Sequence, residues 1–86
     1  MHLTEFITML KTLYPRYYSK NIEFIESINM KDIKKSEIDL LEKIYPYYEN
    51  NDNTGFINLL YKYEEEYGKL GSTITSILLG IKITMS

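Results

Sequence analysis

The chain has 86 residues, no cysteine and a net charge of −2, with 44% hydrophobic and 26% charged side chains. This composition is typical of a single small globular domain, residues 1–86, and it excludes disulfides and thiolate metal sites. The negative balance disfavours nucleic-acid binding, because such proteins usually present a basic face. No basic stretch followed by an apolar run opens the chain, so we expect no secretory signal and a cytoplasmic location.

Apolar residues of the first segment recur with helical spacing. They are Leu3, Phe6, Ile7, Leu10, Leu13 and Tyr14. The spacing predicts a helix that Thr4 caps and Pro15 ends, because proline lacks a backbone donor and disfavours α geometry in the residue before it. A second helix follows, with Ser19 or Asn21 as its cap and an end near Asn29. Its apolar residues are Ile22, Ile25 and Ile28.

A third helix is predicted after the charged connection at residues 31–35. Its apolar residues are Ile38, Leu41, Ile44, Tyr45 and Tyr48. Ser36 suits the N-cap position, and we expect Pro46 to kink or end the helix. The residues around this proline, 44–48, repeat the Tyr-Pro pattern of residues 13–18. We therefore predict two helix–corner–helix units with a Tyr-Pro at each corner.

Two further helices complete the prediction. Residues 50–55 carry the Asn, Asp and Gly side chains of a turn, and a fourth helix then runs from Phe56 until Gly68 or Gly71 ends it. In residues 72–86 the only charged side chain is Lys82, and helical spacing predicts a helix over 73–80. Residues 81–86 alternate with a period of two, so their conformation is left open. The predicted fold is an all-α bundle of four to five short helices, too short in its apolar runs to span a membrane.

No motif carries the chemistry of an enzyme. His2, the one histidine, lies at the terminus and has no cysteine or carboxylate cluster beside it. A calcium loop built on Gly55 would place Tyr61 where a bidentate carboxylate is required. The carboxylates of residues 64–66 point in different directions around a helix. We predict no catalytic residue, no metal and no cofactor.

Tyrosine is abundant, at nine residues, and it is enriched at protein interfaces. The predicted core stripes leave five tyrosines unexplained, namely Tyr17, Tyr18, Tyr47, Tyr48 and Tyr61. The first four lie at the two corners and are candidate partner-binding residues. Packing at the corners is the alternative, and stacking on nucleic-acid bases is a weaker one, because only a few basic residues lie nearby.

The carboxy-terminal segment 72–86 is a second candidate interaction surface. We expect one side of its helix to be buried within the domain, with Ile74, Ile77, Leu78 and Ile81. Leu79, Ile83 and Met85 then lie off that buried stripe, with almost no charge around them. This predicts association with another copy, as a homo-oligomer, or with an apolar helix of a partner. A last helix that is wholly buried in the monomer is the alternative.

The size, the helical pattern, the uncharged end at 72–86 and the abundance of Ile, Lys, Asn and Tyr, which AT-rich genomes favour, form a diffuse pattern over the whole chain. In this it resembles the small helical assembly proteins of tailed phages, tail-assembly chaperones in particular. The resemblance implies a non-enzymatic protein that self-associates and coats an apolar partner, the tape-measure protein. Phage-encoded inhibitors of host defence are similar in the same general way. Residues 5–15 also resemble helicase loaders of phages, without their tryptophan, which implies a replication accessory protein that binds helicase or DNA.

Overall fold

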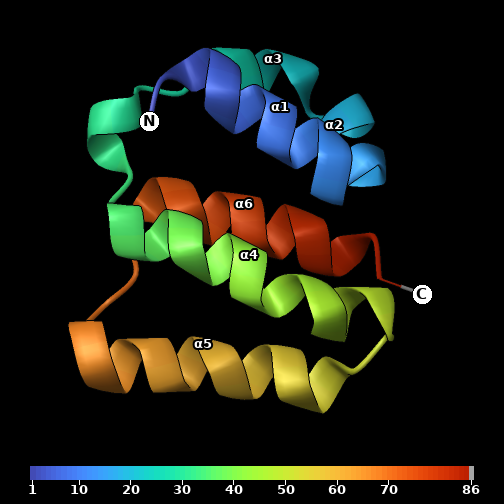
Figure 1. Cartoon of the computed structure of the whole chain (residues 1–86), viewed down its shortest axis with the longest axis vertical. Coiled ribbons are helices and arrows are strands. Elements are labelled where there is room, and N and C mark those ends of the chain that lie inside the picture. The colour runs from blue at the N-terminus through green and yellow to red at the C-terminus, as the bar shows by residue number, and fades with distance from the viewer. Residues whose placement is uncertain (86) are drawn as a thin grey trace.

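The structure is a computed structural model that describes residues 1–85. Over that range the chain forms six α-helices and one 3-10 helix, and no strand, so the predicted all-α class is confirmed. The elements are α1 (Leu3–Leu13), α2 (Pro15–Lys20), α3 (Ile22–Glu26), η1 (Met30–Asp32), α4 (Lys35–Glu49), α5 (Asn53–Tyr67) and α6 (Ser72–Ile83). Figure 1 shows α1 to α3 at one end of the molecule, α4 and α6 in the middle and α5 at the other end.

The first Tyr-Pro motif forms a helix–helix corner, as predicted. Pro15 follows the end of α1 and is the first residue of α2. Proline suits that position because a first-turn backbone N–H has no partner within the helix. The predicted cap of α1 is wrong: His2 takes the N-cap position, and its backbone N–H donates to the Glu5 carboxylate at 3.1 Å. Thr4 lies inside the first turn.

The predicted second helix is divided in two. Ser19 lies inside α2, where its hydroxyl donates to the Arg16 carbonyl at 3.1 Å, so it caps no helix. Asn21 takes the N-cap position of α3, as predicted, but its side-chain amide donates to the Tyr17 carbonyl at 2.9 Å and makes no cap hydrogen bond. The later of these two helices, α3, ends at Glu26, before the predicted end near Asn29. Both side chains donate to a carbonyl three or four residues earlier in the chain, a common local bond of Ser and Asn.

The second Tyr-Pro motif is not a corner, and that prediction is wrong. Pro46 lies inside α4, which continues to Glu49. The proline removes one helical hydrogen bond, but the helix resumes, because the Asn50 N–H donates to the Pro46 carbonyl at 3.0 Å. The predicted N-cap is also wrong: Lys34 takes that position, and Ser36 lies within the first turn.

The fourth helix begins earlier than predicted. The Asp52 carboxylate accepts the backbone N–H of Gly55 at 2.9 Å, so Asn53, Thr54 and Gly55 form the first turn of α5 and not a loop. Aspartate is among the best N-cap residues. Gly68 ends α5 with a φ of 92°, as predicted for a residue that needs positive φ.

The last helix, α6, extends to Ile83, beyond the predicted end at residue 80. Ile81 is fully buried and continues the predicted core stripe. The burial of that side chain outweighs the strand preference of the alternating residues. The whole predicted stripe is buried, namely Ile74, Ile77, Leu78 and Ile81. It packs in one core with Phe6, Leu10, Tyr14, Ile25, Leu41, Ile44 and Phe56.

Candidate functional site

The side of α6 that faces away from the core carries a surface that we call the outer strip. It consists of Ser72, Ser76, Leu79 and Ile83, spaced as residues on one helix face and all exposed. Leu79 is 61% exposed and Ile83 is 81% exposed. The outer strip carries no charge, and Lys82 is the only charged residue of the helix. An uncharged face with two large exposed aliphatic side chains is unusual for a solvated helix.

An apolar groove of about 90 Å³ lies beside the outer strip, between α5 and α6. Its lining consists of Phe56, Ile57, Leu60, Leu70, Leu78 and Leu79 together with Thr75 and Lys82. The Thr75 hydroxyl donates to the Gly71 carbonyl at 2.7 Å, and the Lys82 ammonium donates to the Asn53 side chain. A buried water needs two to four polar partners. Since the polar atoms of the lining are already engaged, the groove favours an apolar side chain as its occupant.

Three of the predicted partner-binding residues belong to this end of the chain. Leu79 and Ile83 are exposed and lie four residues apart on the outer strip. Met85 lies beyond the end of α6 and is half-buried against the core. The structure therefore places the first two on one exposed face and the third against the core.

Tyr17 is a core residue. Its ring lies so close to Gly80 that a Cβ added to the glycine would be 2.3 Å from Tyr17 Cε1. The contact joins α2 to α6 and requires the missing side chain of Gly80. The Tyr17 hydroxyl is buried and has no hydrogen-bond partner in residues 1–85. Its burial raises the pKa of Tyr17 to about 12.

The two Tyr-Pro motifs meet in space and form an aromatic cluster. The Tyr14 ring lies edge-on to Tyr45 and Tyr48, with ring centroids 5.8 and 5.0 Å apart, and its hydroxyl donates to the Leu41 carbonyl. Burial, followed by the nearby Tyr48 and Tyr45, raises the pKa of Tyr14. The Tyr48 hydroxyl is hydrogen-bonded to the Thr84 hydroxyl at 2.8 Å, which ties α4 to the end of α6. The repeated motif thus serves packing.

The other two predicted tyrosines also contact their own domain. Tyr18 is half-buried, and the Lys11 ammonium lies 5.1 Å from its ring centroid. Tyr47 packs against the first turn of α5, where a Cβ on Gly55 would be 2.3 Å from Tyr47 Cδ1. The tyrosines that are most exposed are Tyr61 and Tyr67 on α5. The exposure of Tyr61 agrees with the sequence analysis, which places it among the tyrosines that the core does not explain, whereas the sequence analysis missed Tyr67.

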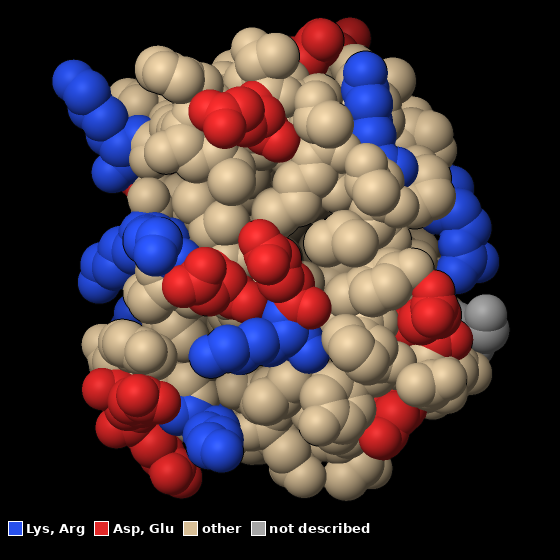
Figure 2. Space-filling view, in the orientation of Figure 1, with Lys and Arg blue, Asp and Glu red and all other residues tan. Residues whose placement is uncertain are grey.

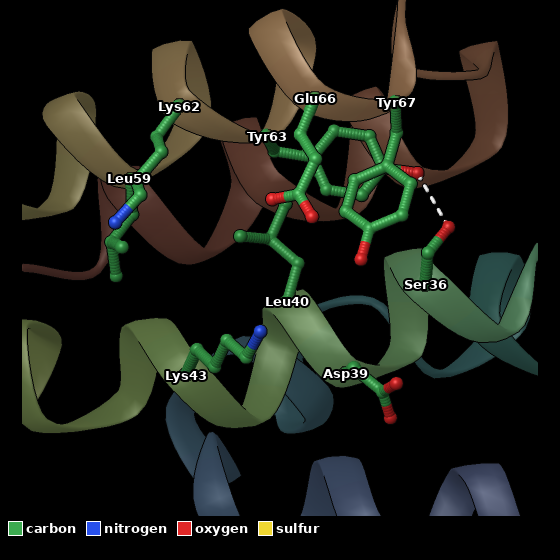
Figure 3. A pocket seen from close by; sticks show the side chains of 9 residues that line it. All are labelled: Ser36, Asp39, Leu40, Lys43, Leu59, Lys62, Tyr63, Glu66 and Tyr67. Atoms are coloured by element: carbon green, nitrogen blue, oxygen red, sulfur yellow. Dashed lines mark hydrogen bonds between the residues drawn. The ribbon is translucent and has the colours of Figure 1, made fainter.

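A second concavity, a cleft of about 290 Å³, lies between α4 and α5. Figure 3 shows Glu66 and Tyr67 extending from α5 toward α4, and Lys43 extending from α4 toward α5. The hydroxyls of Ser36 and Tyr63 are hydrogen-bonded to each other at 2.7 Å. The rim combines two carboxylates and two ammonium groups, Asp39, Glu66, Lys43 and Lys62. This mixture selects no single ligand charge.

The one charged side chain that is buried in the described range is structural. Both oxygens of the Glu37 carboxylate accept backbone N–H groups, one from Lys34 at 2.8 Å and one from Gly71 at 2.9 Å. Glu37 thereby joins the amino-terminal ends of α4 and α6. Within residues 1–85, no group of three or more His, Cys, Asp or Glu residues could hold a metal ion.

No protein-family model, curated protein or solved structure matches this chain. In residues 1–85, none of the helices has the length and apolar character needed to cross a membrane. The fold and the surface together define a small all-α domain whose most distinctive external feature is the uncharged outer strip with its apolar groove.

Proposed function

We propose that this chain is a non-enzymatic protein-binding module, with the outer strip of α6 and the adjoining groove as its contact surface. The observation that carries the proposal is the exposure of Leu79 and Ile83 on a helix face without charge. Complete burial of such a side chain contributes about 1.5–3 kcal/mol. Exposed apolar surface of this kind is typical of interaction sites.

The geometry favours a helical partner segment. An amphipathic helix offers apolar side chains at the spacing of one face, and it can lie along α6 while one side chain enters the groove. The partner surface should itself be uncharged where it meets the outer strip, since a charge buried there without a counter-charge would be costly.

The proposal includes a class of biological role. The resemblance to small tail-assembly chaperones of phages would make the chain an assembly factor in the host cytoplasm, and the apolar partner a segment of a tape-measure protein. The exposed aliphatic pair and the apolar groove are features that such a role requires.

The test is differential capture from host lysate, with and without phage infection, followed by reconstitution. The variant Leu79→Glu/Ile83→Glu places two charges on the outer strip. The matched control Thr8→Glu/Thr12→Glu places two charges at the same spacing on an exposed face of α1. We expect an identified protein that binds the wild type and the control in purified form and binds the α6 variant at least about tenfold more weakly. A purified partner that binds the α6 variant as tightly as the wild type would refute the proposed surface.

A further inference from the structure

We infer that, when no other partner is bound, the outer strip and groove are covered by a second copy of this chain, in a two-fold symmetric dimer whose α6 helices run antiparallel. The inference rests on the proposed function, because it names the partner of that same surface. It is carried by the shape, the charge and the extent of the surface.

The surface is self-complementary in shape. Ile83 protrudes from α6, at 81% exposure, and the apolar groove of about 90 Å³ lies on the same side of the same helix. A two-fold interface is isologous, so a protrusion and a hollow on one surface are filled reciprocally. With the axis near Leu79, this residue meets its own copy, and Ile83 reaches the partner's groove beside Thr75 and Leu78.

The surface is also self-complementary in charge. A facing helix must be uncharged along its length to avoid burying an unpaired charge. α6 meets that condition, with one charged residue in twelve. Lys82 is hydrogen-bonded to Asn53 of its own chain. The antiparallel arrangement separates the two copies of Lys82 on either side of the axis, and it opposes the two helix dipoles favourably.

The contact surface extends beyond α6 onto α5. A standard dimer buries about 800 Å² on each partner, whereas a twelve-residue helix is only about 18 Å long. The molecule is flat, with extents of 29 × 28 × 17 Å. On α5, Ile57 lines the groove, and Tyr61, one turn further along the same helix face, is 63% exposed.

Analytical ultracentrifugation of the full chain tests the dimer. We expect the wild type and the control Thr8→Glu/Thr12→Glu to sediment at twice the monomer mass of 10.2 kDa. The variant Leu79→Glu/Ile83→Glu should be monomeric, with an association constant at least about a hundredfold lower. Its circular dichroism should be unchanged, because both substituted side chains are exposed. The milder variant Leu79→Ser provides the same comparison if the double variant fails to fold.

Cysteine cross-linking tests the orientation, since the natural chain contains no cysteine. In the antiparallel dimer the variant Leu79→Cys lies near the axis and should form an inter-chain disulfide under mild oxidation. The variant Ser72→Cys lies far from its own copy and should not. Disulfides at both positions would indicate parallel helices and would overturn the arrangement.

The remaining outcomes separate the inference from the proposed function. A wild type that is monomeric at millimolar concentration overturns the second copy as occupant. In that case the proposed function still stands if the double variant Leu79→Glu/Ile83→Glu no longer binds the captured partner. If the double variant binds that partner as well as the wild type does, the proposed function is refuted as well. A dimer that persists in the double variant places the self-contact elsewhere and overturns the inference.

Discussion

The two central helices, α4 and α6, share one core but face solvent in opposite ways. Each buries a stripe of aliphatic side chains with almost no exposure. On its outer face α4 presents Lys35, Asp39, Glu42 and Lys43, and Figure 2 shows charges of both signs across that side of the molecule. The outer strip of α6 presents two serines, Leu79 and Ile83. The need for a core therefore explains the apolar residues of α4, whereas the apolar residues on the outer strip of α6 require a further explanation.

The difference shows that hydrophobic content and burial are separate properties. A helix needs one apolar stripe to join a core, and both helices have it. The apolar residues that α6 carries beyond its stripe are mostly exposed and add little to the stability of the monomer. They add free energy only when something covers them.

The largest expected effect is the difference in stability between substitutions on the buried face and on the exposed face of α6. Ile77→Ala removes a fully buried side chain and should lower the free energy of unfolding by about 2–5 kcal/mol. Leu79→Ala, on the outer strip, should change the stability of the monomer by less than about 0.5 kcal/mol. Urea denaturation at low micromolar concentration measures both. A loss above about 2 kcal/mol for Leu79→Ala would show that this residue belongs to the monomer core.

The next effect concerns the bond that joins α4 to α6. Glu37→Ala leaves the backbone N–H groups of Lys34 and Gly71 without their acceptor, which should cost about 1–3 kcal/mol. Glu42→Ala is the control, an exposed carboxylate on the same helix, and should change stability by less than about 0.5 kcal/mol. Thermal denaturation of both variants provides the measurement. Equal melting temperatures would show that the Glu37 bonds contribute nothing net.

The same two helices show how far sequence reasoning reaches. The core stripe of α6 and the all-α class follow from helical spacing, because a repeat of apolar residues at three and four positions has one structural solution. The placement of Leu79 outside that stripe also follows from the geometry of one helix, whereas Ile83 lies beyond the predicted helix end at residue 80 and joins the outer strip only because α6 continues. The core stripe, the all-α class and the position of Leu79 depend only on local order in the chain.

The features that the sequence analysis missed depend on contacts distant in sequence. Pro46 looks like a helix end, yet α4 passes through it, because Ile44 before the proline is buried and Tyr48 after it packs against the core. Tyr17 looks like a surface tyrosine, yet it is buried because Gly80, 63 positions later, leaves room for its ring. Local spacing does not identify the residues that pack around Pro46 or the contact of Tyr17 with Gly80. The groove between α5 and α6 likewise depends on how the two helices pack together.

A smaller effect is expected where α2 contacts α6. Tyr17→Phe removes a buried hydroxyl that has no partner, so the variant should be more stable than the wild type by about 0.5–1.5 kcal/mol. The pH dependence gives a second measure. The folded pKa of Tyr17, about 12, exceeds the unfolded value of 10.0. The folded state therefore binds more protons in this range, and stability should be constant below pH 10 and fall between pH 10 and 12.

Denaturation profiles at pH 8 and pH 11 test both parts. In Tyr17→Phe the decrease should be smaller than in the wild type, and Tyr14 should account for most of what is left, because burial raises its pKa as well. If Tyr17→Phe is less stable than the wild type at pH 8, the hydroxyl has a favourable partner and its burial is not a cost.

The smallest effect distinguishes the two prolines and so tests how α4 tolerates its interruption. Pro46→Ala supplies a backbone N–H inside α4 and removes the clash of the ring with the preceding turn. Against this, alanine gives the unfolded chain more conformational freedom. The net result should be a stabilisation of about 0.5–1 kcal/mol, well below the cost of proline in a helix interior, because the surrounding helix has adapted to it. Pro15→Ala should have the opposite sign, a loss of about 0.5–1 kcal/mol, since Pro15 begins α2 where proline is favourable. Parallel urea titrations of the two variants measure the difference. A loss of stability in both variants would mean that both prolines act mainly through the unfolded chain, and that position within the helix does not matter here.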